Sequence, residues 1–354
     1  MRKHCLVSAL LVSFCAGSVS ATDRYWENPV FTSVEDAVDA ARKALSQVDR
    51  EGPPALRFFV DFVLTEGDAD VRPSSSAITG EAVGSLFITH PTAFVNNPVQ
   101  LQTIERFRNE IPRQRSILEE RLVRFGYPEL PGLVYCRLVE SVDAFSDLGR
   151  ASSEKMTQIG GVTYYCRYVV LPLSYVGEES LRDLRRSAAL NPSINVGDTI
   201  RRWQRESFGN LVNTFRHELV HVHTNTTLDV PSYSNRTAYP TWFHEGTATY
   251  LAADPHSGLS KGYQEYQELF FYLAQRHGIR ELQTFYSDVF SGNDVKTALS
   301  DVFEIAGTEQ LFARSSRWHN TKEVVKNGLW IRPWPSSSRR SEVLTGRTLA
   351  PFKS

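Results

Sequence analysis

Residues Phe215–Thr227, "FRHELVHVHTNTT", place three histidines and a glutamate within seven consecutive positions. His217 and His221 are four residues apart, so on a helix they project from one face, one turn apart. At about 100° per residue, His221 lies only about 40° around the helix from His217. The apolar residues of this segment gather on the opposite side and predict a helix whose histidine pair lies outside its apolar stripe: Phe208, Leu211, Val212, Phe215, Leu219 and Val222.

The spacing His-Glu-x-x-His is typical of a helix that offers two ligands to a metal ion. Glu218 lies beside the pair, where its carboxylate can reach a metal-bound water without itself binding the metal. His223 points elsewhere, at about 240° from His217, so we expect it to have no role at the same ion. A tetrahedral zinc site needs a third protein ligand and an open fourth position for water.

The third ligand is expected in "PTWFHEGTATYLAADP", residues Pro240–Pro255. This stretch predicts a second helix with Thr241 as its N-cap and a proline limiting its end. Glu245 and the adjacent His244 then fall near the start of this helix, and both are candidate ligands. Gly246 has no side chain and is expected to let the two helices approach closely.

Taken together, "HELVH" and "WFHEGTATYLA" resemble the gluzincin zinc metallopeptidases, in particular the catalytic domain of bacterial collagenases and its smaller relatives. The resemblance covers roughly residues 133–310. It implies zinc ligation by His217, His221 and Glu245, one Zn²⁺ per chain, and Glu218 as the catalytic base. The metzincin pattern is excluded because Thr227 occupies the position where that family has a third histidine.

The fold implied by the resemblance is α+β and zincin-like. A small sheet lies over the active-site helix, a mainly helical subdomain follows, and extended substrate binds along a sheet edge. The chain lacks recognisable collagen-binding modules, so collagen is not an implied substrate. The family usually adds a tyrosine or histidine that steadies the oxyanion, and spacing does not choose among Tyr250, Tyr263, Tyr266 and His256.

The organisation predicted along the chain has four parts: a signal peptide (1–21), an N-terminal α/β region or propeptide (22–100), the catalytic domain (101–312) and a basic tail (313–354). Thr32 and Glu35 predict a capping box at the start of a helix. "RFFVDFVL", residues 57–64, reads as a strand. In the catalytic domain we expect a helix over residues 103–125, interrupted or kinked at Pro112, and strands in residues 133–139 and 162–173.

The first 21 residues have a basic start, the short apolar run "CLVSALLVSFCAG" and small residues before the end at Ala21. This pattern predicts a secretory signal peptide and a secreted or periplasmic mature chain from about Thr22. An uncleaved anchor, or a lipoprotein with Cys15 lipidated, are the alternatives. After cleavage only Cys136 and Cys166 remain, which predicts one disulfide in an oxidising compartment, or else two buried free thiols.

Charge is divided unevenly along the chain. The last 42 residues hold 9 Lys/Arg against 2 Asp/Glu, a net charge of +7, while residues 22–312 carry a net charge of −10. An acidic body argues against nucleic acid as the main partner. The basic tail contains Trp318, Trp330 and Trp334, which fits either contact with an anionic surface or an extension whose tryptophans pack on the catalytic domain.

The motif pair therefore predicts a secreted zinc-dependent endopeptidase acting on protein or peptide substrates. A metal-activated water attacks the peptide bond, with a glutamate as general base. Two alternatives remain open: a peptidase or amidase acting on peptidoglycan crosslinks, and a non-catalytic zinc-binding interaction protein on a peptidase scaffold.

Overall fold

The structure is a computed structural model that describes residues 25–45, 54–64, 78–139, 161–173, 178–191, 193–230, 239–254, 259 and 261–320. The predicted signal peptide, residues 1–21, and the tail beyond residue 320 lie outside these ranges. The chain divides into two compact units, residues 1–239 and 240–354. The predicted α+β class is confirmed, since a five-stranded mixed sheet is followed by a mainly helical region.

The sheet of the first unit has the strand order β1-β2-β3-β5-β4. Strands β2, β3 and β5 run parallel, whereas β1 pairs antiparallel with β2 and β4 pairs antiparallel with β5. This sheet runs across the predicted boundary at residue 100, because β1 and β2 precede that residue. The strands are β1 Ile78–Val83, β2 Leu86–Pro91, β3 Val134–Val139, β4 Val162–Tyr164 and β5 Tyr168–Pro172.

Strands β3 and β5 are buried along their whole length, as expected for central parallel strands with both faces covered. The segment over residues 162–173 forms two antiparallel strands rather than one, because a turn at residues 165–167 reverses the chain. Tyr165 adopts φ of 51° in that turn. Because of this reversal, β4 lies at the edge of the described sheet, next to β5.

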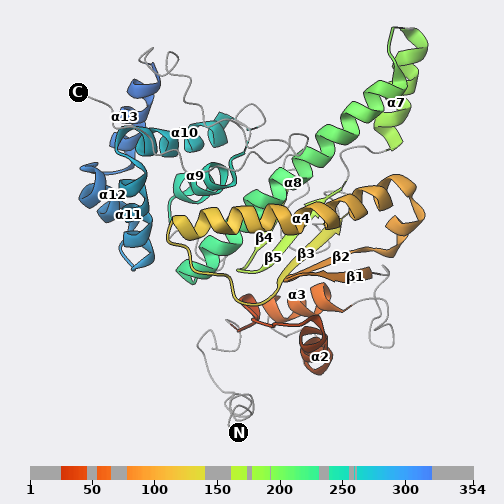
Figure 1. The fold of residues 1–354 in the computed structure, drawn as a ribbon, viewed down its shortest axis with the longest axis horizontal. Helices are drawn as coiled ribbons and strands as arrows, with labels where there is room; N and C mark the ends of the chain where they lie inside the picture. The colour runs from red at the N-terminus through yellow and green to blue at the C-terminus, as the bar shows by residue number, and fades with distance from the viewer. Residues whose placement is uncertain are drawn as a thin grey trace, which may run out of the picture. The chain divides into compact units, whose positions relative to one another are not determined.

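Helices cover both faces of the sheet (Figure 1). On one face lie α2 (Val34–Leu45) and α3 (Pro54–Val63), which share an apolar cluster with residues of β2, β3, β4 and β5. On the other face lie α4 (Pro98–Arg124) and α8 (Val196–Leu228), whose Phe107 and Phe215 rings meet edge to face at 5.6 Å. The sheet is thus the middle layer of a three-layer unit.

The strand predicted over residues 57–64 is wrong, because residues 57–63 belong to helix α3, which ends at Val63. Pro54 starts this helix, where its missing N–H costs nothing. Phe58 and Phe62 are four residues apart and their rings stack at 4.7 Å, so the aromatic residues recur at the helical period. The aromatic and β-branched side chains favour a strand, but their four-residue spacing lets a helix place the rings together in the apolar cluster between α2, α3 and the sheet.

Helix caps correct three further predictions. Ser33, not Thr32, caps α2, with its hydroxyl accepting from the Asp36 N–H at 3.1 Å. Helix α4 begins at Pro98 rather than residue 103, because the Asn97 side chain accepts hydrogen bonds from the N–H groups of Val99 and Gln100. The helix continues through Pro112 without interruption. Pro240 occupies the N-cap of α9, so Thr241 is the first helical residue.

Helix α8 is the longest element in the part of the chain that the structure describes, about 50 Å at 1.5 Å per residue. It follows α7 (Glu178–Leu190) and a short connection in which the Asn195 side chain accepts from the Asp198 N–H at 3.1 Å. Its middle packs against β4 and β5, and Phe215, Leu219 and Val222 are fully buried there. The apolar side chains predicted for this helix thus fix it to the sheet.

The second unit is helical in all its described elements. Gly246 of α9 lies against α10, where an added Cβ would come within 2.6 Å of the Phe270 ring and 2.8 Å of the Tyr266 carbonyl oxygen. In α13, which includes the start of the predicted basic tail, Trp318 packs on Tyr272 with ring centroids 5.8 Å apart. The helices are α9 Thr241–Ala252, α10 Lys261–Arg276, α11 Ile279–Phe290, α12 Val295–Phe303 and α13 Thr308–Asn320.

Cys136 and Cys166 are both buried free thiols in this structure, rather than the predicted disulfide. Cys136 is in the middle of β3 and pairs with Val169 of β5, whereas Cys166 lies in the β4–β5 turn. Burial raises the pKa of both thiols, that of Cys166 to about 12. Within the described ranges, no helix combines the length and apolar character that crossing a bilayer requires.

Candidate metal site

The two histidines of the sequence motif face each other on α8. The Nε2 atoms of His217 and His221 are 3.2 Å apart, and the ring centroids are separated by 4.8 Å. One helical turn separates the residues, which is why their rings reach the same point. Two imidazole nitrogens therefore converge beside α8, as the spacing predicts.

Glu245 completes a three-residue group with this pair. His217, His221 and Glu245 each offer one ligand atom, and these atoms all lie within 4.8 Å of one another. Glu245 is the fifth residue of α9 and lies just past its first turn. Among the residues that the structure describes, the group includes Glu245 and not the neighbouring His244.

The donor atoms of this group suit a transition metal ion. Two imidazole nitrogens and one carboxylate oxygen are a ligand set used by zinc, and imidazole also binds copper, iron and nickel. Ligands about 2.0–2.1 Å from a tetrahedral zinc lie about 3.3–3.4 Å from each other. The observed 3.2 Å between the two Nε2 atoms is close to that value, so the histidine pair fits an ion of this size.

Glu218 is buried next to the pair, with 6% of its surface exposed. The hydroxyl of Thr163, on β4, lies 2.8 Å from Glu218 Oε2 and 2.9 Å from the Glu218 main-chain oxygen. The sheet thus provides a hydrogen-bond donor for the carboxylate predicted to be the base. Sequence reasoning missed Thr163, which is 55 residues away and belongs to no recognisable motif.

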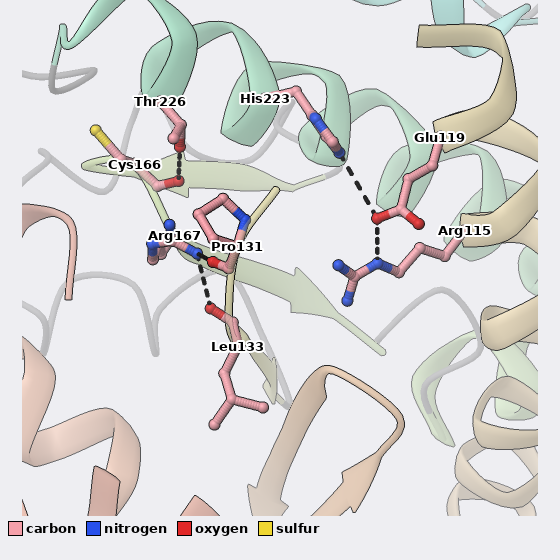
Figure 2. Close-up of polar contacts among 8 residues, drawn as sticks. All are labelled: Arg115, Glu119, Pro131, Leu133, Cys166, Arg167, His223 and Thr226. Atoms are coloured by element: carbon pink, nitrogen blue, oxygen red, sulfur yellow. Dashed lines mark hydrogen bonds and ion pairs between the residues drawn. The ribbon is translucent and has the colours of Figure 1, made fainter. Parts of the chain in front are cut away.

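Helix α8 also bonds to the turn of the β4–β5 hairpin, one to two helical turns after the histidine pair. The Asn225 side-chain amide donates to the Tyr165 carbonyl oxygen at 3.0 Å, and the Thr226 hydroxyl donates to the Cys166 carbonyl oxygen at 3.2 Å. Arg167, in the turn between β4 and β5, anchors this hairpin by donating to the carbonyl oxygens of residues 131 and 133 (Figure 2). The histidine-bearing turns of α8 are therefore held against β4 and β5 by directional bonds as well as apolar contacts.

His223 is directed toward α4 and does not belong to the three-residue group (Figure 2). Its Nε2 lies 3.8 Å from Glu119 Oε1, while Arg115 donates to the same carboxylate oxygen at 2.6 Å. Burial, together with the charges of Arg115 and Arg167, lowers the pKa of His223 to about 3. The ring is thus neutral at physiological pH, and it lies away from the histidine pair, as its position on the helix predicts.

The residues considered for oxyanion stabilisation have different surroundings. Tyr250 is buried inside the second unit, where its ring stacks on Phe270 at 5.8 Å. Tyr263 is exposed on α10, and the Tyr266 ring lies edge-on to Phe312 at 6.3 Å. His256 lies outside the described residues. These surroundings do not assign the oxyanion role to one of the described tyrosines.

No family model, curated protein or solved structure matches the chain in the comparisons with known proteins. The resemblance to the gluzincins therefore depends on the motif residues themselves.

Proposed function

We propose that this protein is a secreted zinc-dependent endopeptidase with a zincin-like catalytic fold. The observation that carries the proposal is the convergence of His217, His221 and Glu245, with Glu218, the residue after His217 on α8, also buried. Two imidazoles and one carboxylate are the ligand set of known zinc peptidases, in which a further position stays open for water. The predicted signal peptide supports the secreted location.

In this proposal each side chain has one task. His217, His221 and Glu245 hold the ion. Zinc in such a site lowers the pKa of a bound water and polarises the carbonyl group of the scissile bond. Glu218 accepts a proton as the water oxygen adds to the carbonyl carbon, and it donates that proton to the leaving amine as the C–N bond breaks.

A peptide substrate agrees with the position of β4. This strand ends the described sheet and contributes Thr163 to the Glu218 site. An extended peptide can add to the edge of a sheet through main-chain hydrogen bonds, which is how the resembling family binds substrate. Because a non-catalytic zinc-binding protein has no need for a second carboxylate beside the ligands, Glu218 favours hydrolysis over simple binding.

The test compares wild type with Glu218→Gln, measuring bound zinc and cleavage of a peptide library. We expect the variant to retain about one zinc per chain, because Glu218 is not in the ligand group. Cleavage is expected to fall by at least about 100-fold, the usual contribution of a general base. Glu206→Gln, on an exposed part of the same helix, is the matched control and should behave as wild type.

Full peptidase activity in Glu218→Gln would refute the proposed role. Parallel digestion of peptidoglycan and casein separates the possible substrate classes. Cleavage of peptidoglycan alone would replace the general endopeptidase proposal with the crosslink-specific one. Zinc binding by a wild-type chain that cleaves no substrate of either class would support the non-catalytic alternative.

A further inference from the structure

We infer that Thr163 is a positioning residue that holds the Glu218 carboxylate in its working orientation. The inference rests on the proposed function, because it assigns a task to Thr163 only if Glu218 acts as the base. Thr163 is the middle residue of β4 and is buried, with 5% of its surface exposed. Its hydroxyl makes the only hydrogen bond to the Glu218 carboxylate found among the described residues.

The hydroxyl of Thr163 is well suited to fixing this side chain. A glutamate has three rotatable side-chain bonds, whereas the β-branched threonine has few rotamers available in a strand. Thr163 Oγ1 reaches both Oε2 and the main-chain oxygen of Glu218, so the hydroxyl is located relative to the backbone of α8 as well as to the carboxylate. A hydroxyl both donates and accepts, so it can keep a bond to Glu218 before and after proton transfer.

Close packing of the strand on the helix brings the hydroxyl to this point. A Cβ added at Gly161 would lie 2.6 Å from Thr214 Cγ2, 2.8 Å from Leu171 Cδ2 and 3.2 Å from Glu218 Cγ. The backbone just before β4 therefore lies directly against the stem of Glu218. Alternation along β4 then directs Thr163 toward α8 and Tyr164 toward Phe58, on the opposite face.

The separation of tasks between Thr163 and the ligand group makes the inference specific. Thr163 is not a member of that group, so its removal should leave metal binding intact. Misplacing a reacting group by about 1 Å can cost about 100-fold in rate, even when the group itself is still present. The effect should therefore appear in kcat and not in zinc content.

The experiment uses the full chain and compares Thr163→Val with Thr163→Ser. We expect Thr163→Val to keep its zinc and a KM within about 2-fold of wild type, while kcat falls by about 10- to 100-fold. Thr163→Ser retains the hydroxyl and should keep kcat within about 3-fold of wild type. Thr79→Val, which removes a hydroxyl from β1 of the same sheet, is the matched control and should not change kcat.

A double substitution gives a readout that general damage to the fold would not reproduce. In the Glu218→Gln background, adding Thr163→Val should lower the residual rate by less than about 2-fold, because the carboxylate that Thr163 positions has already been removed. A loss as large as in the wild-type background would overturn the inference. So would an unchanged kcat in Thr163→Val, or a Thr163→Ser variant as slow as Thr163→Val.

If Thr163→Val does not fold, Thr163→Ala removes the same hydroxyl with a smaller side chain, and wild-type kcat in that variant overturns the inference. Failure of the proposed function has a different signature. Wild type that cleaves no peptide, or Glu218→Gln with full activity, removes the base itself, and the inference about Thr163 falls with it. An active wild type that depends on Glu218 but not on Thr163 rejects the positioning role alone.

Discussion

Two histidines separated by a single residue on α8 have different chemistry. His221 turns toward His217, with the two Nε2 atoms 3.2 Å apart, while His223 is buried against Glu119 and Arg115 of α4. A difference of two positions is about 200° around a helix, so the two rings cannot serve the same ion. The pattern of a single motif was enough to separate them, because helical geometry is regular.

Cys136 and Cys166 are expected to be protected thiols. Thiolate is the reactive form, and burial raises the pKa of both groups. A thiol reagent should therefore find no reactive cysteine in a folded chain expressed without residues 1–21. After unfolding without reductant, titration should give two thiols per chain. A count of zero that becomes two only after reduction would show that the predicted disulfide forms instead.

At the scale of elements, close contact between α9 and α10 depends on Gly246. The Cβ of an alanine there would meet the Phe270 ring at 2.6 Å and the Tyr266 backbone at 2.8 Å, so one of the helices must move. We expect Gly246→Ala to lower the free energy of unfolding by about 1–3 kcal/mol, the usual cost of overpacking, as measured by denaturant titration.

The matched control for Gly246→Ala is Gly262→Ala in the first turn of α10. An added Cβ at Gly262 meets nothing within 4 Å. Its stability should stay the same or rise by up to about 1 kcal/mol, because alanine favours helix. Equal stability of the two variants would contradict the packing role assigned to Gly246. The sequence predicts that this glycine lets α9 approach the motif helix, whereas the atoms nearest to it belong to α10.

Strand β4 and helix α3 illustrate how elements depend on their neighbours. The residues of α3 have aromatic and β-branched side chains that favour strands, yet their spacing lets a helix direct the rings onto one cluster. Residues 162–164 form a short strand because β5 offers antiparallel hydrogen bonds. The strand preference of the residues was overridden in α3, whereas in β4 it was supported by pairing with β5.

For the whole molecule, a bound metal should stabilise the fold. The ligand group joins residues 217, 221 and 245, which an unfolded chain does not hold together. Free zinc at about 100 times its dissociation constant should raise the free energy of unfolding by about 2.7 kcal/mol, and chelation should remove this gain. The measurement is thermal or denaturant unfolding with and without chelator.

Glu245→Gln weakens the ligand group and should reduce the response of stability to zinc. Glu265→Gln alters an exposed carboxylate of α10 and should leave that response unchanged. A zinc response of the same size in Glu245→Gln and wild type would show that Glu245 is not a ligand.

The α+β class and the choice of Glu245 over His244 followed from the family resemblance, whereas the residues alone predicted the motif helix, the strand at residues 133–139 and the approach of His217 to His221. These features depend on periodicity and short spacing, which the chain carries locally. Only the folded chain shows that residues 57–63 form a helix, that residues 162–173 form a hairpin, and that Thr163 meets Glu218. The Thr163–Glu218 contact joins segments 55 residues apart, and helix α3 packs on a cluster that includes residues of four strands, so no local pattern records either contact. The hairpin depends on the turn at residues 165–167, where strand propensity gave no signal of a reversal.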